Sequence, residues 1–175
     1  MRKPGNPASC LASLRDAAGN ILLLKQQDRN KWNRTLIEKG IFHLEASAEG
    51  ESVSKYQLEA GIAYEHARAT SYQQTNWKNI LQCYDLLIKL YPSPVIELNR
   101  AVVISELNGP AEGIKAIEAI EQISTLIKYY LLPATLGELY LQLKQYEKAD
   151  EYFTEAMQLT QSAAEKKLLQ QKMKR

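Results

Sequence analysis

The chain has 175 residues, of which 45% are hydrophobic and 24% are charged, a composition typical of one globular domain and not of a disordered protein. No apolar run approaches the roughly 20 residues of a membrane span, and no signal-peptide core is present, so we expect no membrane association and a cytoplasmic location. The net charge is +2, but residues 163–175 carry +4, which leaves about −2 on the rest and argues against a nucleic-acid-binding face there.

The first 52 residues predict a helical N-terminal subdomain with a short extended segment. Asn6-Pro7 can start a short helix that continues to about Leu14, and residues 16–20 form a turn. The apolar run 21–24 is the only short one bounded by turn residues. A second helix is predicted from about residue 30 to 46, because apolar residues recur there at helical spacing.

The sequence "QQDRNKW" lies where the apolar run ends and the second helix begins. Asp28 is suited to cap that helix, because its carboxylate can accept hydrogen bonds from the first free N–H groups. Trp32 is then expected to be largely buried, and Arg29 to pair with a carboxylate or a backbone carbonyl of the following repeats. We therefore predict that Asp28, Arg29 and Trp32 form a structural joint.

From residue 53 onward the sequence has the spacing of tetratricopeptide repeats. Six positions in the best segment match that pattern: Leu136, Gly137, Tyr140, Ala149, Phe153 and Ala156. Two degenerate copies precede it at steps of 36 and 33 residues. The sequence predicts an all-α, right-handed α-solenoid over residues 53–175, with helix pairs 55–70 with 76–90, 94–107 with 110–122 and 127–143 with 145–159, and a capping helix 161–173.

Residues with catalytic chemistry form no recognisable motif. The two histidines, His43 and His66, have no metal-ligand spacing to an acid or a thiol, and Cys10 and Cys83 lie far apart with no CxxC spacing. We therefore expect no enzyme activity, no cofactor and no metal.

Several blocks of the chain together resemble the C-terminal extension of a group of bacterial extracytoplasmic-function (ECF) RNA polymerase sigma factors. The blocks are "QQDRNKW", "YQLEAGIAYEHA" from Tyr56, "NW" at 76–77, "YDLLIKLYPSPVIELNRAVVISELNGPAEG" from Tyr84 and "YYLLPATLGELY" from Tyr129. The candidate interaction or joint residues lie within these blocks: Asp28, Arg29, Trp32, Tyr56, Gln57, His66, Asn99 and Arg100.

The resemblance implies a tetratricopeptide-like module that regulates transcription initiation through protein–protein contacts. Its partners would be the RNA polymerase core and the protein's own sigma domains. The promoter-reading domains of the family are missing from this sequence, which suggests a fragment of a longer protein. We therefore expect no direct DNA binding by this chain.

Two other functions fit the sequence less well. A stand-alone tetratricopeptide adaptor would bind a peptide on its concave face, but Arg100 is one cation beside Asn99 and mainly apolar groups, which makes a poor carboxylate clamp. The repeat phase places these residues on that face: Leu98, Val102, Ser105, Leu131, Ala134, Glu138 and Leu141. A small hydrolase has no nucleophile–base pair to support it.

Overall fold

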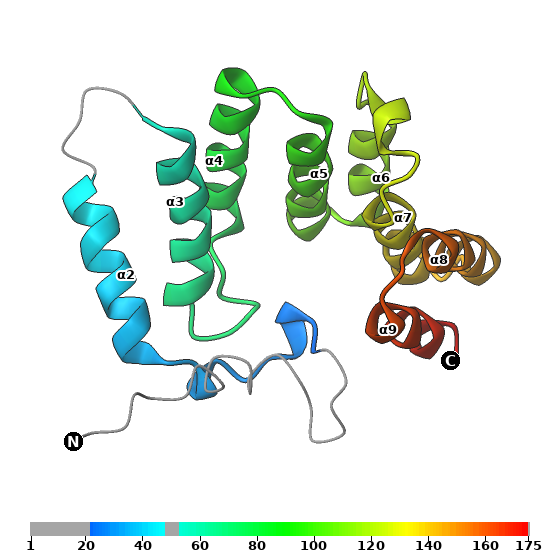
Figure 1. Cartoon of the computed structure of the whole chain (residues 1–175), viewed down its shortest axis with the longest axis horizontal. Coiled ribbons are helices and arrows are strands. Elements are labelled where there is room, and N and C mark those ends of the chain that lie inside the picture. Colours follow the sequence, from blue (N-terminus) through cyan, green and yellow to red (C-terminus); the bar gives the residue numbers. More distant parts are fainter. Residues whose placement is uncertain (1–21, 48–52, 175) are drawn as a thin grey trace. The chain divides into compact units, whose positions relative to one another are not determined.

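The computed structural model describes residues 22–47 and 53–174, and within 43–47 it describes the backbone only. Every regular element in these ranges is a helix and none is a strand, which confirms the predicted all-α class (Figure 1). The chain divides into two compact units, Met1–Asn76 and Trp77–Arg175, each described here by itself. The sequence analysis placed its boundary at residues 52 and 53, so the helices predicted as the first pair belong to different units.

The described residues of unit 1 form two short 3-10 helices followed by two α-helices. The 3-10 helices are η1 (Leu24–Gln26) and η2 (Arg29–Lys31), and the α-helices are α2 (Arg34–Ser47) and α3 (Lys55–Arg68). The helices α2 and α3 pack side by side (Figure 1). Ser54 and Gln57 form a capping box at the start of α3, since each side chain accepts a hydrogen bond from the other residue's backbone N–H.

The start of unit 1 differs from the sequence prediction in two ways. The helix predicted from residue 30 begins only at Arg34, because Trp32 has extended backbone (ψ 144°) and Asn33 Oδ1 accepts from the N–H of Leu36 (3.1 Å). Leu23 is extended, but Leu24 already belongs to η1, so the described part of the apolar run forms no strand. The predicted helix up to Leu14 and the turn at 16–20 lie outside the described residues.

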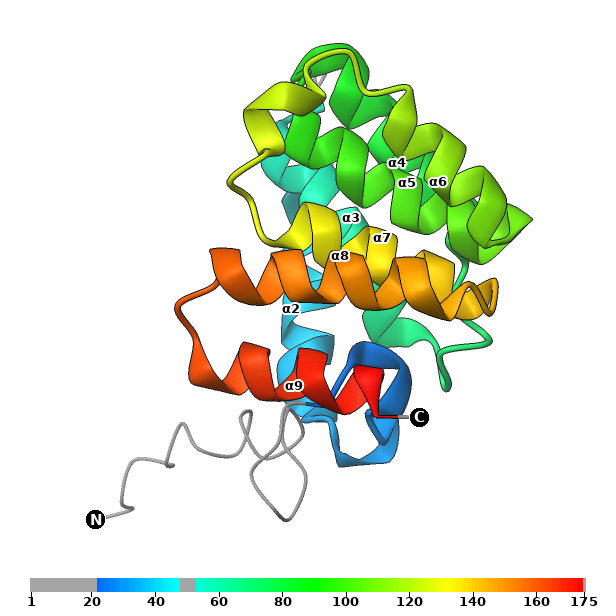
Figure 2. The same cartoon turned by 90° about the vertical axis from the view of Figure 1, so that its right-hand side faces the viewer.

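Unit 2 is a series of helices joined by short connections. It contains α4 (Trp77–Leu90), α5 (Pro94–Asn108), α6 (Pro110–Glu118), η3 (Ile123–Leu126), α7 (Leu131–Gln142), α8 (Tyr146–Leu159) and α9 (Ala163–Met173). Helix α5 packs on α4 and α6, α7 packs on α8, and α9 packs on α8. Figure 2 shows α8 and α9 running in opposite directions beside α7.

Proline and glycine set the helix ends in unit 2. Pro94 and Pro110 are the first residues of α5 and α6, where the missing N–H costs no hydrogen bond. Gly109 separates these helices with φ 94°, a left-handed backbone conformation that favours glycine. Pro133 lies in the first turn of α7, which begins at Leu131 and not at residue 127. The proline itself predicts such a later start, near Leu132, as the alternative to a bent helix. Helix α6 ends at Glu118, four residues before the predicted end, and η3 follows it.

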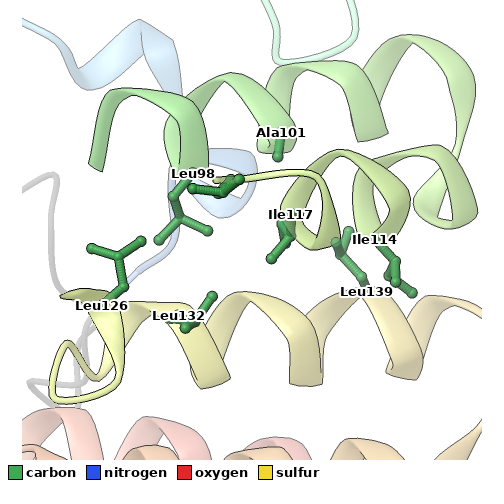
Figure 3. Packing of buried hydrophobic residues seen from close by; sticks show 8 residues of the cluster. Leu98, Ala101, Ile114, Ile117, Leu126, Leu132 and Leu139 are labelled. Atoms are coloured by element: carbon green, nitrogen blue, oxygen red, sulfur yellow. The ribbon is translucent and has the colours of Figure 1, made fainter. Parts of the chain in front are cut away.

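The core of unit 2 lies where α5, α6 and α7 meet. Figure 3 shows buried aliphatic side chains from these helices and from η3 converging on one another. The cluster consists of Leu98, Ala101, Ile114, Ile117, Ile120, Leu126, Leu132 and Leu139. Each of these residues is at most 9% exposed, so burial of apolar surface is the main force that holds these helices together.

Two glycines allow neighbouring helices of unit 2 to approach closely. A Cβ atom on Gly137 in α7 would lie 2.6 Å from the ring of Phe153 in α8. A Cβ atom on Gly113 in α6 would lie 2.5 Å from the Cβ of Ser105 in α5. Both pairs therefore pack with no room for a side chain at the glycine. The pattern position Gly137 is confirmed as a close contact, and Ala149, Phe153 and Ala156 are fully buried as that pattern requires.

Candidate functional site

A network of polar contacts in unit 1 surrounds Arg29, whose side chain is buried with the residue only 3% exposed. One terminal nitrogen, Nη1, donates hydrogen bonds to the backbone carbonyls of His66 and Ala69, the second at 3.2 Å. The other, Nη2, donates to the hydroxyl oxygen of Thr75 at 3.2 Å. Arg29 therefore joins the segment before α2 to the end of α3 and to the loop that follows it.

The end of α3 explains why a guanidinium is useful at this place. The last four carbonyls of a helix have no partner within the helix, and a glycine cap often satisfies them. Helix α3 ends at Arg68 and is followed by Ala69 in an extended conformation, so it has no such glycine. Arg29 supplies the missing donors from another segment of the chain.

Electrostatics around Arg29 favour a fixed hydrogen-bonding role for it. Burial lowers the pKa of Arg29, the phenol of Tyr72 opposes this effect, and the charge of Arg34 adds to it. The guanidinium nevertheless stays protonated in proteins. Its three acceptors are neutral oxygens, so the arrangement positions a cation and does not transfer a proton.

His66 contributes its carbonyl oxygen to this site. Burial lowers the pKa of its imidazole, the charge of Arg29 lowers it further, and the carboxylate of Glu65 raises it. We conclude that His66 is neutral near pH 7. Glu65 is itself buried and lies 3.9 Å from the guanidinium of Arg68 on the next turn.

Trp32 packs against the guanidinium of Arg29, whose central carbon lies 5.0 Å from the ring centroid. This is a cation–π contact. Trp32 is half-buried and follows η2, which corrects the prediction of a largely buried residue inside the second helix. Asp28 caps η2, since its Oδ1 accepts from the N–H of Asn30 at 3.0 Å, and Asn33 takes the predicted capping role at α2.

The structure brings four of the predicted residues together in unit 1, because Asp28, Arg29, Trp32 and His66 lie around one site. Tyr56 is 81% exposed at the opposite end of α3, and Gln57 forms part of the capping box there. These two residues therefore serve the start of α3 and not the Arg29 site.

Asn99 and Arg100 belong to α5 in unit 2. Asn99 is exposed, and the Nε of Arg100 donates to Asp85 Oδ1 of α4 at 2.6 Å. This ion pair is partly exposed, so its contribution to stability is small. Arg100 is occupied by Asp85 in this arrangement and does not stand ready as a carboxylate clamp.

Sequence reasoning missed the polar contacts that hold α9. The hydroxyl of Tyr130 donates to Glu165 Oε1 at 2.7 Å, and the hydroxyl of Thr160 donates to Glu165 Oε2. Lys172 forms an ion pair with Glu138, with both side chains less than a quarter exposed. The sequence showed only that residues 163–175 are basic, and this composition does not predict that Lys172 pairs with Glu138.

A pH titration can test the contact between Tyr130 and Glu165. Burial, the hydrogen bond to Glu165 and the negative charge of that carboxylate raise the pKa of Tyr130 to about 12. A phenol with a raised folded-state pKa stabilises the fold below its unfolded pKa, and this contribution disappears as pH rises through the folded value.

We therefore expect Tyr130→Phe to be less stable than the parent chain at about pH 9, with the difference shrinking towards pH 12. Urea unfolding followed by circular dichroism at several pH values measures this. The matched control is Tyr146→Phe, because Tyr146 is 47% exposed. A stability difference between the parent chain and Tyr130→Phe that stays constant with pH would contradict the contact between Tyr130 and Glu165.

Charge elsewhere on unit 2 gathers on one face of α8. A shallow surface there is lined by Glu147, Asp150, Glu151, Thr154, Glu155 and Gln158. Among the residues that the structure describes, no group of three or more His, Cys, Asp or Glu side chains could hold a metal ion. Within the same residues, no helix is long and apolar enough to cross a membrane.

The residues that the structure describes define an all-helical protein, in which hydrogen bonds of Arg29 join α3 to the segment before α2 and apolar burial holds the helices of unit 2 together. No protein-family model matches the chain, and no solved structure matches it. An uncharacterized protein of Rhizobium meliloti (strain 1021) is 35% identical to it over 150 residues. The match covers 86% of this chain and 35% of that protein, so the chain spans about a third of the length of this relative.

Proposed function

We propose that this chain is a regulatory module of an ECF-type sigma factor and that it modulates transcription initiation through protein–protein contacts. Its helix pairs are tetratricopeptide-like repeats of a right-handed α-solenoid. The module works in the cytoplasm, catalyses no reaction, and contacts the RNA polymerase core and the sigma domains of its own protein. The promoter-binding domains are not in this sequence.

The observation that carries the proposal is the Arg29 site. The two sequence blocks "QQDRNKW" and "YQLEAGIAYEHA" resemble this group of sigma factors, and they are 23 residues apart in the chain. Arg29 of the first block binds the carbonyl of His66 in the second. The two blocks that carry the resemblance are therefore in direct contact. This is expected if they form one structural joint, and it is not expected of two chance similarities.

A joint of this kind can transmit a change in position. Arg29 has three acceptors on two different segments, so the segment around it cannot shift without breaking hydrogen bonds of a buried cation. A force on the residues before η2 therefore reaches the end of α3. This is how the module would respond to the sigma domains or affect them.

The helix packing in unit 2 disfavours the adaptor alternative. A peptide-binding adaptor needs its concave face open, and the repeat phase places Ala134, Glu138 and Leu141 on that face. Glu138 is paired with Lys172 of α9, and Ala134 and Leu141 pack against the cluster that contains Leu169 of α9. The last part of this face is thus covered by the chain itself.

Two experiments test the proposed function. The reading frame upstream of Met1 should encode a helix-turn-helix domain in frame, and its absence would contradict the proposal. Transcription by RNA polymerase core with the full-length protein should depend on its promoter and should change with Arg29→Ala. The matched control is Lys31→Ala, which alters an exposed neighbour. Unchanged transcription for a folded Arg29→Ala protein would remove the joint from the mechanism.

The isolated chain is expected to show no appreciable binding to duplex DNA at physiological salt. Binding to DNA requires a basic stripe that releases counterions, and residues 1–162 carry about −2. Fluorescence anisotropy with a labelled duplex measures this. Salt-sensitive, submicromolar binding that survives neutralisation of Lys166, Lys167, Lys174 and Arg175, which removes the net charge of residues 163–175, would show the expectation to be wrong.

A further inference from the structure

The Arg29 site contains two N–H donors that its own hydrogen bonds do not use. Arg29 Nε and Trp32 Nε1 are both buried, and neither donates to an acceptor within the residues that the structure describes. A buried donor without an acceptor destabilises a fold, and almost all buried donors in proteins have one. Two such donors in one contact therefore require an acceptor that these residues do not provide.

A count of the donors on the guanidinium adds a further N–H group. An arginine side chain has five N–H donors. Nη1 donates to the backbone carbonyls of His66 and Ala69, and Nη2 donates to Thr75 Oγ1. These bonds leave the Nε–H and one N–H on a terminal nitrogen. Pairs of N–H groups on a guanidinium are the donors that bind a carboxylate through two parallel hydrogen bonds.

The charge around this site also favours an anion. All three acceptors of Arg29 are neutral oxygens, and within the described residues it has no carboxylate partner. The buried carboxylate of Glu65 lies 3.9 Å from Arg68 instead. Arg34, the first residue of α2, adds a second positive charge near Arg29. Residues 22–34 carry a net charge of +3, so an acidic group of a partner would be attracted to this segment.

One carboxylate can reach both buried donors. The Cζ atom of Arg29 lies 5.0 Å from the ring centroid of Trp32. Nε is bonded to that carbon and Nε1 is part of that ring, so the two donors are separated by a distance of the same order. Each oxygen of a carboxylate can accept a charge-assisted hydrogen bond of about 2.7–2.9 Å, and the two oxygens together can bridge this separation.

We propose that Arg29 and Trp32 form a binding site for a carboxylate, and that the ligand is an acidic side chain of a protein partner. The carboxylate accepts from Arg29 Nε and Trp32 Nε1 and provides a counter-charge for the buried guanidinium. The three existing hydrogen bonds of Arg29 stay in place, so the ligand strengthens the joint. Since Trp32 is half-buried and Arg29 is only 3% exposed, the ligand enters past the Trp32 ring. The proposal concerns the ligand of this site and does not depend on the proposed function.

The first test titrates the isotope-labelled parent chain with sodium acetate and follows its side-chain N–H signals by NMR. We expect the indole N–H of Trp32 and the Nε–H of Arg29 to shift together. Both should saturate with one dissociation constant in the millimolar range, as for a ligand of few atoms. Sodium chloride at equal ionic strength should leave both signals in place, and so should acetamide, a neutral molecule of similar shape.

Two tryptophan variants make the test specific. Trp32→Phe removes the indole N–H but keeps an aromatic face for the guanidinium, so the chain should fold. Its dissociation constant for acetate, followed at Arg29 Nε–H, should be at least about tenfold higher than that of the parent chain, because a hydrogen bond to a charged group is lost. Trp77→Phe is the matched control, since it removes the half-buried indole of α4 in unit 2 and should leave the dissociation constant unchanged.

A pair of peptides tests the source of the carboxylate. One contains a single glutamate among alanine and serine residues, and the other has glutamine in its place. Both ends are blocked, so the glutamate side chain is the only carboxylate. At equal concentration the glutamate peptide should shift the Trp32 and Arg29 signals at least as strongly as acetate does, and the glutamine peptide should shift neither.

Three results would overturn the proposal. The first is no shift of either signal with acetate up to about 100 mM, well beyond the range of specific affinity. The second is an equal response to acetamide, or an acetate affinity that Trp32→Phe leaves unchanged, since these donors would then not select a carboxylate. The third is binding of acetate without binding of the glutamate peptide, which would assign the site to a small free acid. The titration of the parent chain stands even where a variant fails to fold.

Discussion

Phe153→Ala is expected to lower the free energy of unfolding of unit 2 by about 3–5 kcal/mol. The Phe153 side chain is fully buried, and its ring lies against Gly137 of α7. Truncation removes the apolar ring and leaves a cavity that the two helices can close only in part. Urea unfolding followed by circular dichroism measures the change, and Tyr146→Ala on the exposed face of the same helix serves as control.

A double-mutant cycle makes this test specific for the contact with Gly137. Gly137→Ala alone should destabilise the chain, because its Cβ would lie 2.6 Å from the Phe153 ring. In the Phe153→Ala background that clash is absent, so the same substitution should cost less or should stabilise α7 through its better helix propensity. Additive effects would mean that α7 and α8 do not pack through this pair.

Arg29→Ala is expected to destabilise the end of α3 by about 2–4 kcal/mol, because the buried carbonyl of Ala69 and the partly buried carbonyl of His66 lose their donors. Part of the loss is offset, since the substitution also removes the cost of burying a cation. Hydrogen exchange of the α3 backbone should report a protection loss of about 30- to 1000-fold in its last turn.

Two further variants separate charge from geometry at this site. Arg29→Lys keeps the charge but has one nitrogen, which cannot reach Ala69 and Thr75 in the fork geometry of the guanidinium. We expect Arg29→Lys to lose more than half of the stability that Arg29→Ala loses. Arg29→Met keeps about the same side-chain volume without the hydrogen-bond donors. Its loss of stability should lie between those of Arg29→Lys and Arg29→Ala. Full recovery in Arg29→Lys would show that charge alone matters.

The starts of α5 and α6 in unit 2 could be located from the sequence, because local chemistry dictates them. Pro94 and Pro110 begin α5 and α6 where predicted, and Gly109 provides the left-handed turn between them. The close approach of Gly137 and Phe153 follows from the repeat spacing, since only small residues allow two helices to touch there. Helix starts and close-packed glycine positions can be predicted because they depend on adjacent residues or on the regular spacing of residues along a helix.

The turn between α7 and α8 shows where local reasoning stops. Lys144 has φ 60° in that turn, a conformation normally taken by glycine. No sequence rule predicts a lysine there. The packing of α7 on α8 determines the chain path, and the residue adopts the backbone conformation that this path requires.

In the candidate site, too, some features could be predicted from the sequence and others required the tertiary structure. The sequence by itself determined that Asp28, Arg29 and Trp32 begin a helical segment and that Arg29 needs an acceptor, because a buried cation without one is costly. Only the tertiary structure decided that the acceptors are His66, Ala69 and Thr75, which lie 37 to 46 residues further along the chain. It likewise decided that Glu165 and Lys172 hold α9 on α7. Contacts between distant residues leave no periodic trace in a single sequence, since any chain path that brings the two groups together satisfies them equally well.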